Sequence, residues 1–281
     1  MAAQATGETA DLGEVIVHHI SNGEVLVPLR IGGLDLSITK HVVVLWIVAL
    51  LVIGLFTWLG RRLKNAEDGA PKGRMATMLE FFVSFIREQM VLPFIGQKYA
   101  ATFTPLILTF FTFILMSNLL GLTPLLLLLS FVPGLHGLRE GSSTPTGNFN
   151  VTAALAVITF FSIIYAGSVA HGFFGHWKNL VPRGMHWSLY FILIPIELIS
   201  MFVKPFALTM RLAANMTAGH AAIMAIMSLI FVFKSVLIGL FVSTPLAIGL
   251  SLLEIIVSFV QAYVFSLLSA IFIGMAIHVH H

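Results

Sequence analysis

Long apolar runs separated by short polar stretches make up most of the chain beyond residue 40. A helix needs about 20 apolar residues to cross a hydrocarbon core about 30 Å thick. Runs of that length or more cover about 41–60, 103–130, 150–171, 187–233 and 236–277. The pattern predicts a membrane domain, residues 41–281, with five transmembrane helices. An extracytoplasmic N-terminal segment, residues 1–40, would precede it as short strands or a surface loop.

Residues 75–92 carry a different pattern, with polar residues on one helical face and large apolar residues on the rest. The polar positions recur at steps of three and four: Thr77, Glu80, Ser84, Arg87 and Glu88. Three charges make a membrane span costly, so an amphipathic helix lying in the membrane interface is predicted. Pro93 is expected to end this helix.

The last two runs, 187–233 and 236–277, are too long for upright spans. A helix of 40 residues measures about 60 Å, roughly twice the thickness of the hydrocarbon core. Each run therefore either contains a break or forms a strongly tilted helix. We predict an all-α polytopic membrane protein whose last two helices are long, tilted and antiparallel.

The composition excludes several classes of protein. Hydrophobic residues make up 58% of the chain and charged residues 10%, with a mean hydropathy of +0.99. A soluble domain carries about 25% charged residues, so a soluble enzyme or a disordered chain is excluded. The net charge of +3 comes from basic residues in short loops, so no nucleic-acid partner is expected. The chain has no cysteine, and its histidines are scattered, so we expect no metal site and no cofactor.

Basic residues predict the orientation in the membrane. Arg61, Arg62 and Lys64 follow the first span, and loops on the cytoplasmic side carry an excess of such residues. The N-terminus is therefore expected outside and the C-terminus in the cytoplasm, as in a multi-pass protein of a bacterial inner membrane.

Ionisable residues inside the membrane are expensive and by default mark an ion path. The run 187–233 contains four of them: Glu197, Lys204, Arg211 and His220. The first three are spaced seven residues apart and share one helical face, which Asn215 continues one turn further. His220 lies about half a turn away from the face of Arg211.

The run 236–277 carries one narrow polar stripe. Ser251, Glu254, Ser258 and Gln261 follow each other at steps of three, four and three. Because the two helices run in opposite directions, His220 and Glu254 can meet in the outer half of the membrane. Arg211 and Gln261 can meet near the midplane, and Glu197 belongs to the inner half.

Arg211 carries the most information about mechanism. Arginine stays protonated at any working pH, so it is a poor proton carrier but a fixed cation that holds an anion. It would separate two half-routes, with His220 and Glu254 on one side and Glu197 on the other. A partner must supply the opposing carboxylate, because this chain places no acid opposite Arg211.

These residues carry a family resemblance. The run from Lys204 to His220, KPFALTMRLAANMTAGH, resembles the signature of subunit a of the rotary F-type ATP synthase, and Glu254–Phe265 resembles its last helix. The surface helix and the span containing Asn118 follow in the same order, so the resemblance covers most of 41–277.

The resemblance implies a stator beside a ring of c subunits, held with b-type peripheral-stalk subunits and membrane lipid. Arg211 matches the arginine that faces the ring carboxylate, Asn215 the asparagine beyond it, Glu197 the inner-channel acid and Gln261 the glutamine near the arginine. Asn118, Ser251, Ser258 and Lys204 are further candidates for channel lining.

Two positions differ from many bacterial members. Those members exchange the pair that is His220 and Glu254 here, and they have Asp soon after the asparagine matching Asn118, where this chain has Leu119, Leu120 and Gly121. A His–Glu relay survives the exchange, whereas the outer entrance has a different composition.

Two rival functions would require other features in the sequence. A stand-alone ion-coupled secondary transporter would show inverted repeats and broken helices, which are not evident. An intramembrane hydrolase would need H-E-x-x-H or G-x-S-x-G, and neither occurs. ATP chemistry would lie on other subunits, because the chain has no phosphate-binding G-x-x-x-x-G-K-[ST] loop, and a non-catalytic membrane subunit is predicted.

Overall fold

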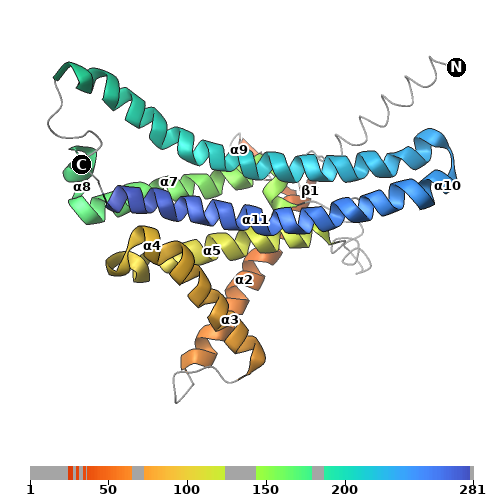
Figure 1. Ribbon diagram of the computed structural model, residues 1–281, viewed down its shortest axis with the longest axis horizontal. Helices are drawn as coiled ribbons and strands as arrows, with labels where there is room; N and C mark the ends of the chain where they lie inside the picture. Colours follow the sequence, from red (N-terminus) through yellow and green to blue (C-terminus); the bar gives the residue numbers. More distant parts are fainter. Residues whose placement is uncertain are drawn as a thin grey trace. The chain divides into compact units, whose positions relative to one another are not determined.

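The computed structural model describes residues 25–27, 30–31, 34–35, 37–64, 73–123, 144–178 and 187–278. Within these ranges five helices are long and apolar enough to cross a membrane (Figure 1). They comprise His41–Lys64, Gln97–Leu122, Phe149–His171, Phe191–Phe233 and Val236–Ile277. The predicted all-α fold class is confirmed.

Short strands precede the first helix. β1 (Val25–Val27) pairs antiparallel with β4 (Ile38–Thr39), and β2 (Arg30–Ile31) pairs antiparallel with β3 (Leu34–Asp35). The expectation of short strands is met for this part of the N-terminal segment, and residues 1–24 lie outside the described ranges.

The first long helix, α2 (Lys40–Lys64), extends beyond the predicted end at residue 60. The basic residues that were expected to follow the helix instead form its last turn: Arg61, Arg62 and Lys64. Positive side chains favour a helix C-terminus, where the backbone carbonyls carry partial negative charge. The Arg62 guanidinium lies 5.2 Å from the centroid of the Trp58 ring, within the range of a cation–π interaction.

The prediction that Pro93 ends the amphipathic helix is wrong. α3 (Arg74–Ile86) continues through a π-helical turn, η1 (Arg87–Val91), into α4 (Leu92–Ile95). Pro93 comes just after this π-helical turn, and a local π-helical adjustment compensates for the backbone hydrogen bond that a proline removes. The helical path ends instead at Gly96, whose φ of +81° suits glycine.

The predicted start of the second span is also wrong, and its predicted end at 130 lies outside the described residues. α5 (Gln97–Leu122) begins six residues before the predicted start at 103, directly after the turn at Gly96. A span predicted from hydropathy begins after Lys98, because this residue is charged. In the structure Lys98 lies in the first turn of α5, with its ammonium 5.0 Å from the centroid of the Tyr99 ring. Residues 124–143 lie outside the described ranges. The third span, α7 (Phe149–His171), agrees with the predicted 150–171 and is followed by α8 (Phe173–Lys178).

The last two runs are long helices. α9 (Trp187–Phe233) continues for 47 residues through Pro195 and Pro205. After a turn at Lys234, α10 (Val236–Ile238), the π-helical turn η4 (Gly239–Ser243) and α11 (Thr244–Ile277) follow without interruption. A 47-residue helix measures about 70 Å, more than twice the hydrocarbon thickness. Of the two alternatives for α9, the structure therefore contains the continuous helix.

The chain divides into two compact units, each drawn from three separate stretches. One unit contains the described residues of Leu50–Phe113, Thr152–Arg211 and Ala262–His281. Its core is rich in aromatic pairs, such as Phe110 with Phe265 at 5.5 Å between ring centroids, and Phe160 stacked on Phe202 at 5.0 Å. Such pairs contribute about 0.5–1.5 kcal/mol each beyond the burial of their area.

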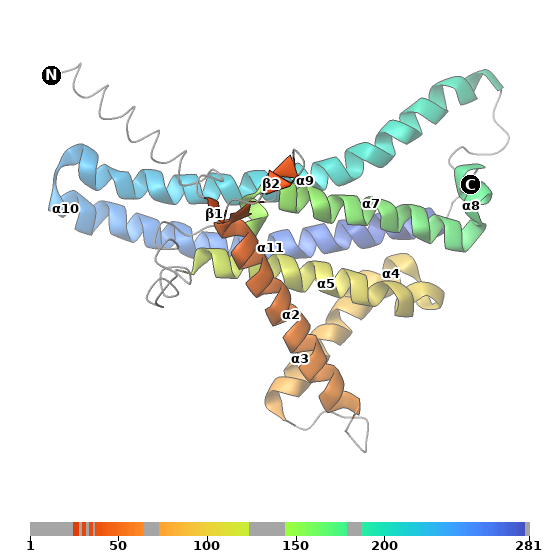
Figure 2. The same cartoon turned by 180° about the vertical axis from the view of Figure 1, so that it is seen from behind.

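The other unit contains the described residues of Met1–Ala49, Ile114–Val151 and Leu212–Gln261. Here α9 and α11 run side by side, as both views show (Figures 1 and 2). Val48, Ile114 and Leu212 are fully buried in its core. This unit also buries polar side chains, among them Asn118, Glu254 and Gln261, which belong to the candidate site.

Candidate functional site

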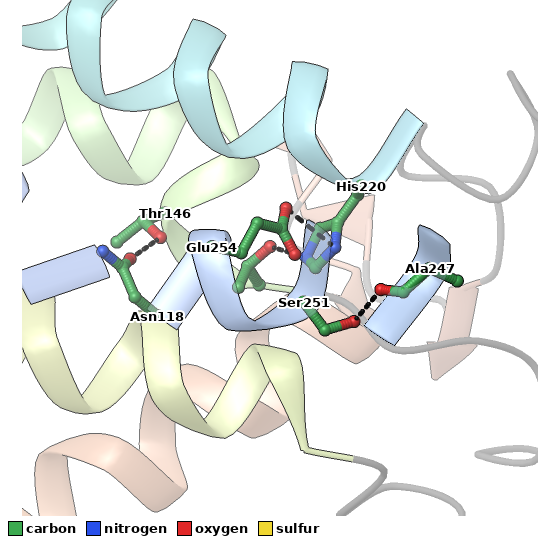
Figure 3. Close-up of polar contacts among 7 residues, drawn as sticks. Asn118, Thr146, His220, Ala247, Ser251 and Glu254 are labelled. Carbon is green, nitrogen blue, oxygen red and sulfur yellow. Dashed lines mark hydrogen bonds and ion pairs between the residues drawn. The ribbon is translucent and has the colours of Figure 1, made fainter. Parts of the chain in front are cut away.

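His220 on α9 and Glu254 on α11 face each other across the two helices (Figure 3). His220 Nδ1 lies 3.8 Å from Glu254 Oε1, and the two side chains are 17% and 6% exposed. The predicted meeting of these residues is therefore observed. Because the residues come from different helices, one imidazole and one carboxylate are held together in a region that excludes most water.

Glu254 is buried without a fixed hydrogen bond. Neither of its carboxylate oxygens has a hydrogen-bond partner among the described residues. A buried carboxylate that is fully hydrogen-bonded resists a change in its protonation. Glu254 Oε1 instead faces the His220 imidazole, without a hydrogen bond to it.

Gly219 brings the backbone of α9 close to Glu254. A Cβ added at residue 219 would overlap the Glu254 carboxylate and lie 2.9 Å from its carboxyl carbon. Small residues allow helices to approach closely within a membrane. The missing side chain at residue 219 therefore makes room for the carboxylate beside His220.

Replacing Gly219 with alanine is expected to displace this carboxylate and to slow proton conduction about 10-fold, since overpacking costs about 1–3 kcal/mol. Passive proton conduction through reconstituted membrane sectors measures the effect. Gly249→Ala is the matched control, because a Cβ there meets no atom within 4 Å. Equal conduction in the two variants would show that the close approach has no role.

Asn118 on α5 belongs to a second buried cluster in the same unit (Figure 3). Its Nδ2 donates to the carbonyl of Ser258 on α11 at 3.4 Å, and its Oδ1 accepts from the hydroxyl of Thr146. Asn118, Thr146 and Ser258 are fully buried, and Ser258 Oγ has no hydrogen-bond partner among the described residues. The cluster joins α5, α11 and the short helix η3 (Pro145–Gly147).

Asn215 and Gln261 also meet, as α9 and α11 pass each other further along. Asn215 Nδ2 donates to Gln261 Oε1 at 3.2 Å. The polar stripes predicted on these helices therefore face each other at two levels, His220–Glu254 and Asn215–Gln261. The predicted meeting of Arg211 with Gln261 stays a prediction.

Arg211 is exposed on α9. No described residue forms an ion pair or hydrogen bond with its guanidinium. Lys204, two turns earlier, places its ammonium 5.7 Å from the centroid of the Phe272 ring. Glu197 lies on α9, and its side chain is outside the described part of the structure. Ser251 donates to the carbonyl of Ala247 within its own helix at 2.9 Å (Figure 3).

Sequence reasoning missed two threonines that contact predicted site residues, and a third that contacts the turn carrying them. Thr144, just before η3, lies 2.6 Å from His220 through its Oγ1 and the ring Nε2. Thr217 donates to the carbonyl of Gly147 at 3.3 Å, and Thr146 donates to Asn118. In the sequence, Thr144 and Thr146 look like ordinary turn residues. The one sequence feature that could have indicated close packing here is a small residue, Gly219, next to His220.

Comparison with known proteins places the chain in a family. The family model described as ATP synthase A chain matches residues 42–274. The chain belongs to this family. "ATP synthase subunit a 2" of Prosthecochloris aestuarii is 44% identical, over 98% of this chain and 82% of that protein. "ATP synthase subunit a" of Myxococcus xanthus is 42% identical, over 92% of this chain and 79% of that protein.

Family membership confirms the resemblance and settles the class of function. The chain is a multi-pass membrane protein of a bacterial ATP synthase, with other Fo subunits as partners. It is the proton-translocating stator subunit of the Fo sector and carries no catalytic site for ATP. The stand-alone transporter and the intramembrane hydrolase are thereby set aside.

Proposed function

We propose that His220 and Glu254 form the proton entry route of this stator subunit, with Arg211 as the barrier that separates it from an exit route near Glu197. The observation that carries the proposal is the 3.8 Å pairing of an imidazole with a buried carboxylate that no described residue hydrogen-bonds. Both groups can gain and lose a proton, and each can pass it to the other or to water.

Basic residues at the end of α2 support the orientation of the route. Arg61, Arg62 and Lys64 stand on the cytoplasmic side in this proposal, so the N-terminus lies outside and the C-terminus in the cytoplasm of a bacterial inner membrane. α9 then runs outward and α11 inward. His220 and Glu254 lie in the outer half, and Glu197 lies about 34 Å further inward along α9.

The exposed position of Arg211 supports its role as the barrier. A charge in the membrane needs a partner, and within the described residues none pairs with Arg211. We assign as that partner the carboxylate of a c subunit in a rotating ring. The fixed cation keeps the carboxylate ionised as it passes and repels any proton that would cross directly from one route to the other.

Protons then move in two separate steps. A proton enters past His220 and Glu254, neutralises a ring carboxylate, and leaves near Glu197 after nearly a full turn of the ring. Asn215 and Gln261 hold α9 and α11 in register beside the barrier. The membrane potential supplies about 2.3 kcal/mol per charge per 100 mV, and this work drives rotation.

Apolar surface on both long helices supports a partner ring. Large exposed side chains cover α9 near Arg211 and α11 near Glu254: Phe202, Phe206, Met210, Leu252, Ile256 and Phe259. In the proposal these side chains contact c subunits or lipid, while b-type stalk subunits hold the stator in place. Asn118, Ser258, Ser251 and Lys204 line the routes.

His220→Ala tests the entry route. The expected result is a reduction of passive proton conduction through the reconstituted membrane sector by at least about 10-fold, because proton transfer by a positioned side chain contributes about 10²–10⁴-fold to a rate. Conduction is measured with a pH-sensitive dye in vesicles, after the content of this subunit in the complex has been checked. Wild-type conduction would exclude His220 from the route.

A further inference from the structure

We propose that Thr144 is a positioning residue of the proton entry route: its hydroxyl holds the His220 ring so that Nδ1 faces Glu254. This inference rests on the proposed function, because it assigns a role to a residue that acts through His220. It concerns a threonine that neither the helical pattern nor the polar stripes of the sequence singled out.

Each ring nitrogen of His220 faces one polar side chain, Thr144 at Nε2 and Glu254 at Nδ1. Thr144 Oγ1 lies 2.6 Å from Nε2, and the two atoms form a hydrogen bond. Nδ1, on the other side of the ring, lies 3.8 Å from the Glu254 carboxylate. Thr144 is 2% exposed, so water does not compete for this hydroxyl. The hydroxyl therefore determines which nitrogen is directed at Glu254.

A hydroxyl suits a ring that changes its protonation state. When the imidazole is neutral with its proton on Nε2, Nε2–H donates to the hydroxyl oxygen, and the lone pair of Nδ1 faces Glu254. When the imidazole is protonated, Nε2–H donates to the hydroxyl oxygen, which has lone pairs to accept it. Thr144 can thus keep the ring in one orientation while a proton is gained and passed on at Nδ1.

Gly121 makes this position of Thr144 available. A Cβ added at residue 121 would overlap the Thr144 side chain and lie 2.6 Å from its Cα. Any larger residue at position 121 would therefore push the backbone of Thr144 away from its position. Two further contacts hold the following residues, since Thr146 donates to Asn118 and Thr217 of α9 donates to the carbonyl of Gly147. The turn is fixed to α5 and α9, and it presents its hydroxyl to His220.

The test is a double-mutant cycle in the assembled ATP synthase, reconstituted in liposomes. Thr144→Val keeps the shape of the side chain and removes the hydroxyl, and it is expected to lower passive proton conduction about 2- to 10-fold, the range of one hydrogen bond. Thr144→Ser retains the hydroxyl and is expected to conduct like the wild type. In a His220→Ala background, Thr144→Val is expected to have no further effect.

The outcomes separate this inference from the proposed function. If His220→Ala slows conduction but Thr144→Val does not, the inference fails and the proposed entry route stands. If His220→Ala conducts normally, the proposed route itself fails. An equal cost of Thr144→Val with and without His220 would show a merely structural role and would overturn the inference.

Gly121→Ala provides an independent arm that leaves the hydroxyl in the sequence but displaces it. Its expected effect equals that of Thr144→Val and likewise disappears when His220 is absent. Subunit content in the purified complex is measured for every variant, so that slower conduction is attributed only to complexes that contain the subunit. Normal conduction in an assembled Gly121→Ala complex would also overturn the inference.

Discussion

Replacing Arg211 with alanine is expected to abolish ATP-driven proton pumping while the complex still assembles. The guanidinium is exposed on α9, so its removal leaves no cavity in the core of the subunit. In the proposed mechanism it keeps the ring carboxylate ionised. A charge near the membrane centre costs at least about 2.5 kcal/mol, which corresponds to a roughly 70-fold lower rate once the compensating cation is lost.

Fluorescence quenching in inverted membrane vesicles measures this pumping, and Met210→Ala is the matched control. Met210 is the neighbouring exposed residue and has no charge, so its truncation removes surface but not the barrier. The passive proton leak should persist in Arg211→Ala, because the cation that blocks direct transfer is gone. Normal pumping in this variant would remove the central assignment.

Replacing Glu254 with glutamine is expected to have the second largest effect. Glutamine has nearly the same shape as glutamate but cannot release a proton, so ATP synthesis should fall at least about 10-fold. Because Gly219 packs closely on the carboxylate, the variant should keep the volume of glutamate. A loss of ATP synthesis in Glu254→Gln then reflects the missing acidic proton and not a change in packing. ATP synthesis by liposomes under an imposed pH gradient is the measurement.

Glu254→Asp is the matched comparison for this residue. Aspartate keeps the titrating group but draws it back from His220 by one methylene, so its activity should lie between those of glutamate and glutamine. Equal rates in all three proteins would exclude Glu254 from the relay. If Glu254→Asp and Glu254→Gln lose ATP synthesis equally, the position of the carboxylate matters as much as its charge.

The helices were predictable from the sequence wherever length and hydropathy decide. The third span, 149–171, and the two long helices agree with the predicted ranges. The errors lie at ends where apolar content is a poor guide. Lys98 is helical although it is charged, and Pro93 is helical because a π-helical turn precedes it.

The site was predictable where it follows from periodicity within one helix. Seven-residue spacing put Arg211 on one face of α9, and steps of three and four put Glu254 and Gln261 on one stripe of α11. Because the two helices run in opposite directions, His220 and Glu254 were expected at the same depth. In the structure His220 Nδ1 lies 3.8 Å from Glu254 Oε1. The match of Asn215 with Gln261 is of the same kind.

By itself the sequence determined that the protein spans a membrane, which residues carry charge inside it, and to which family it belongs. These properties depend on composition, on local periodicity and on a continuous run of residues. Only the tertiary structure decided that Thr144 reaches His220 and that Gly121 and Gly219 leave the necessary space. Such contacts join residues far apart in the chain, and whether a side chain fits there depends on how closely two backbones approach, which no local pattern encodes.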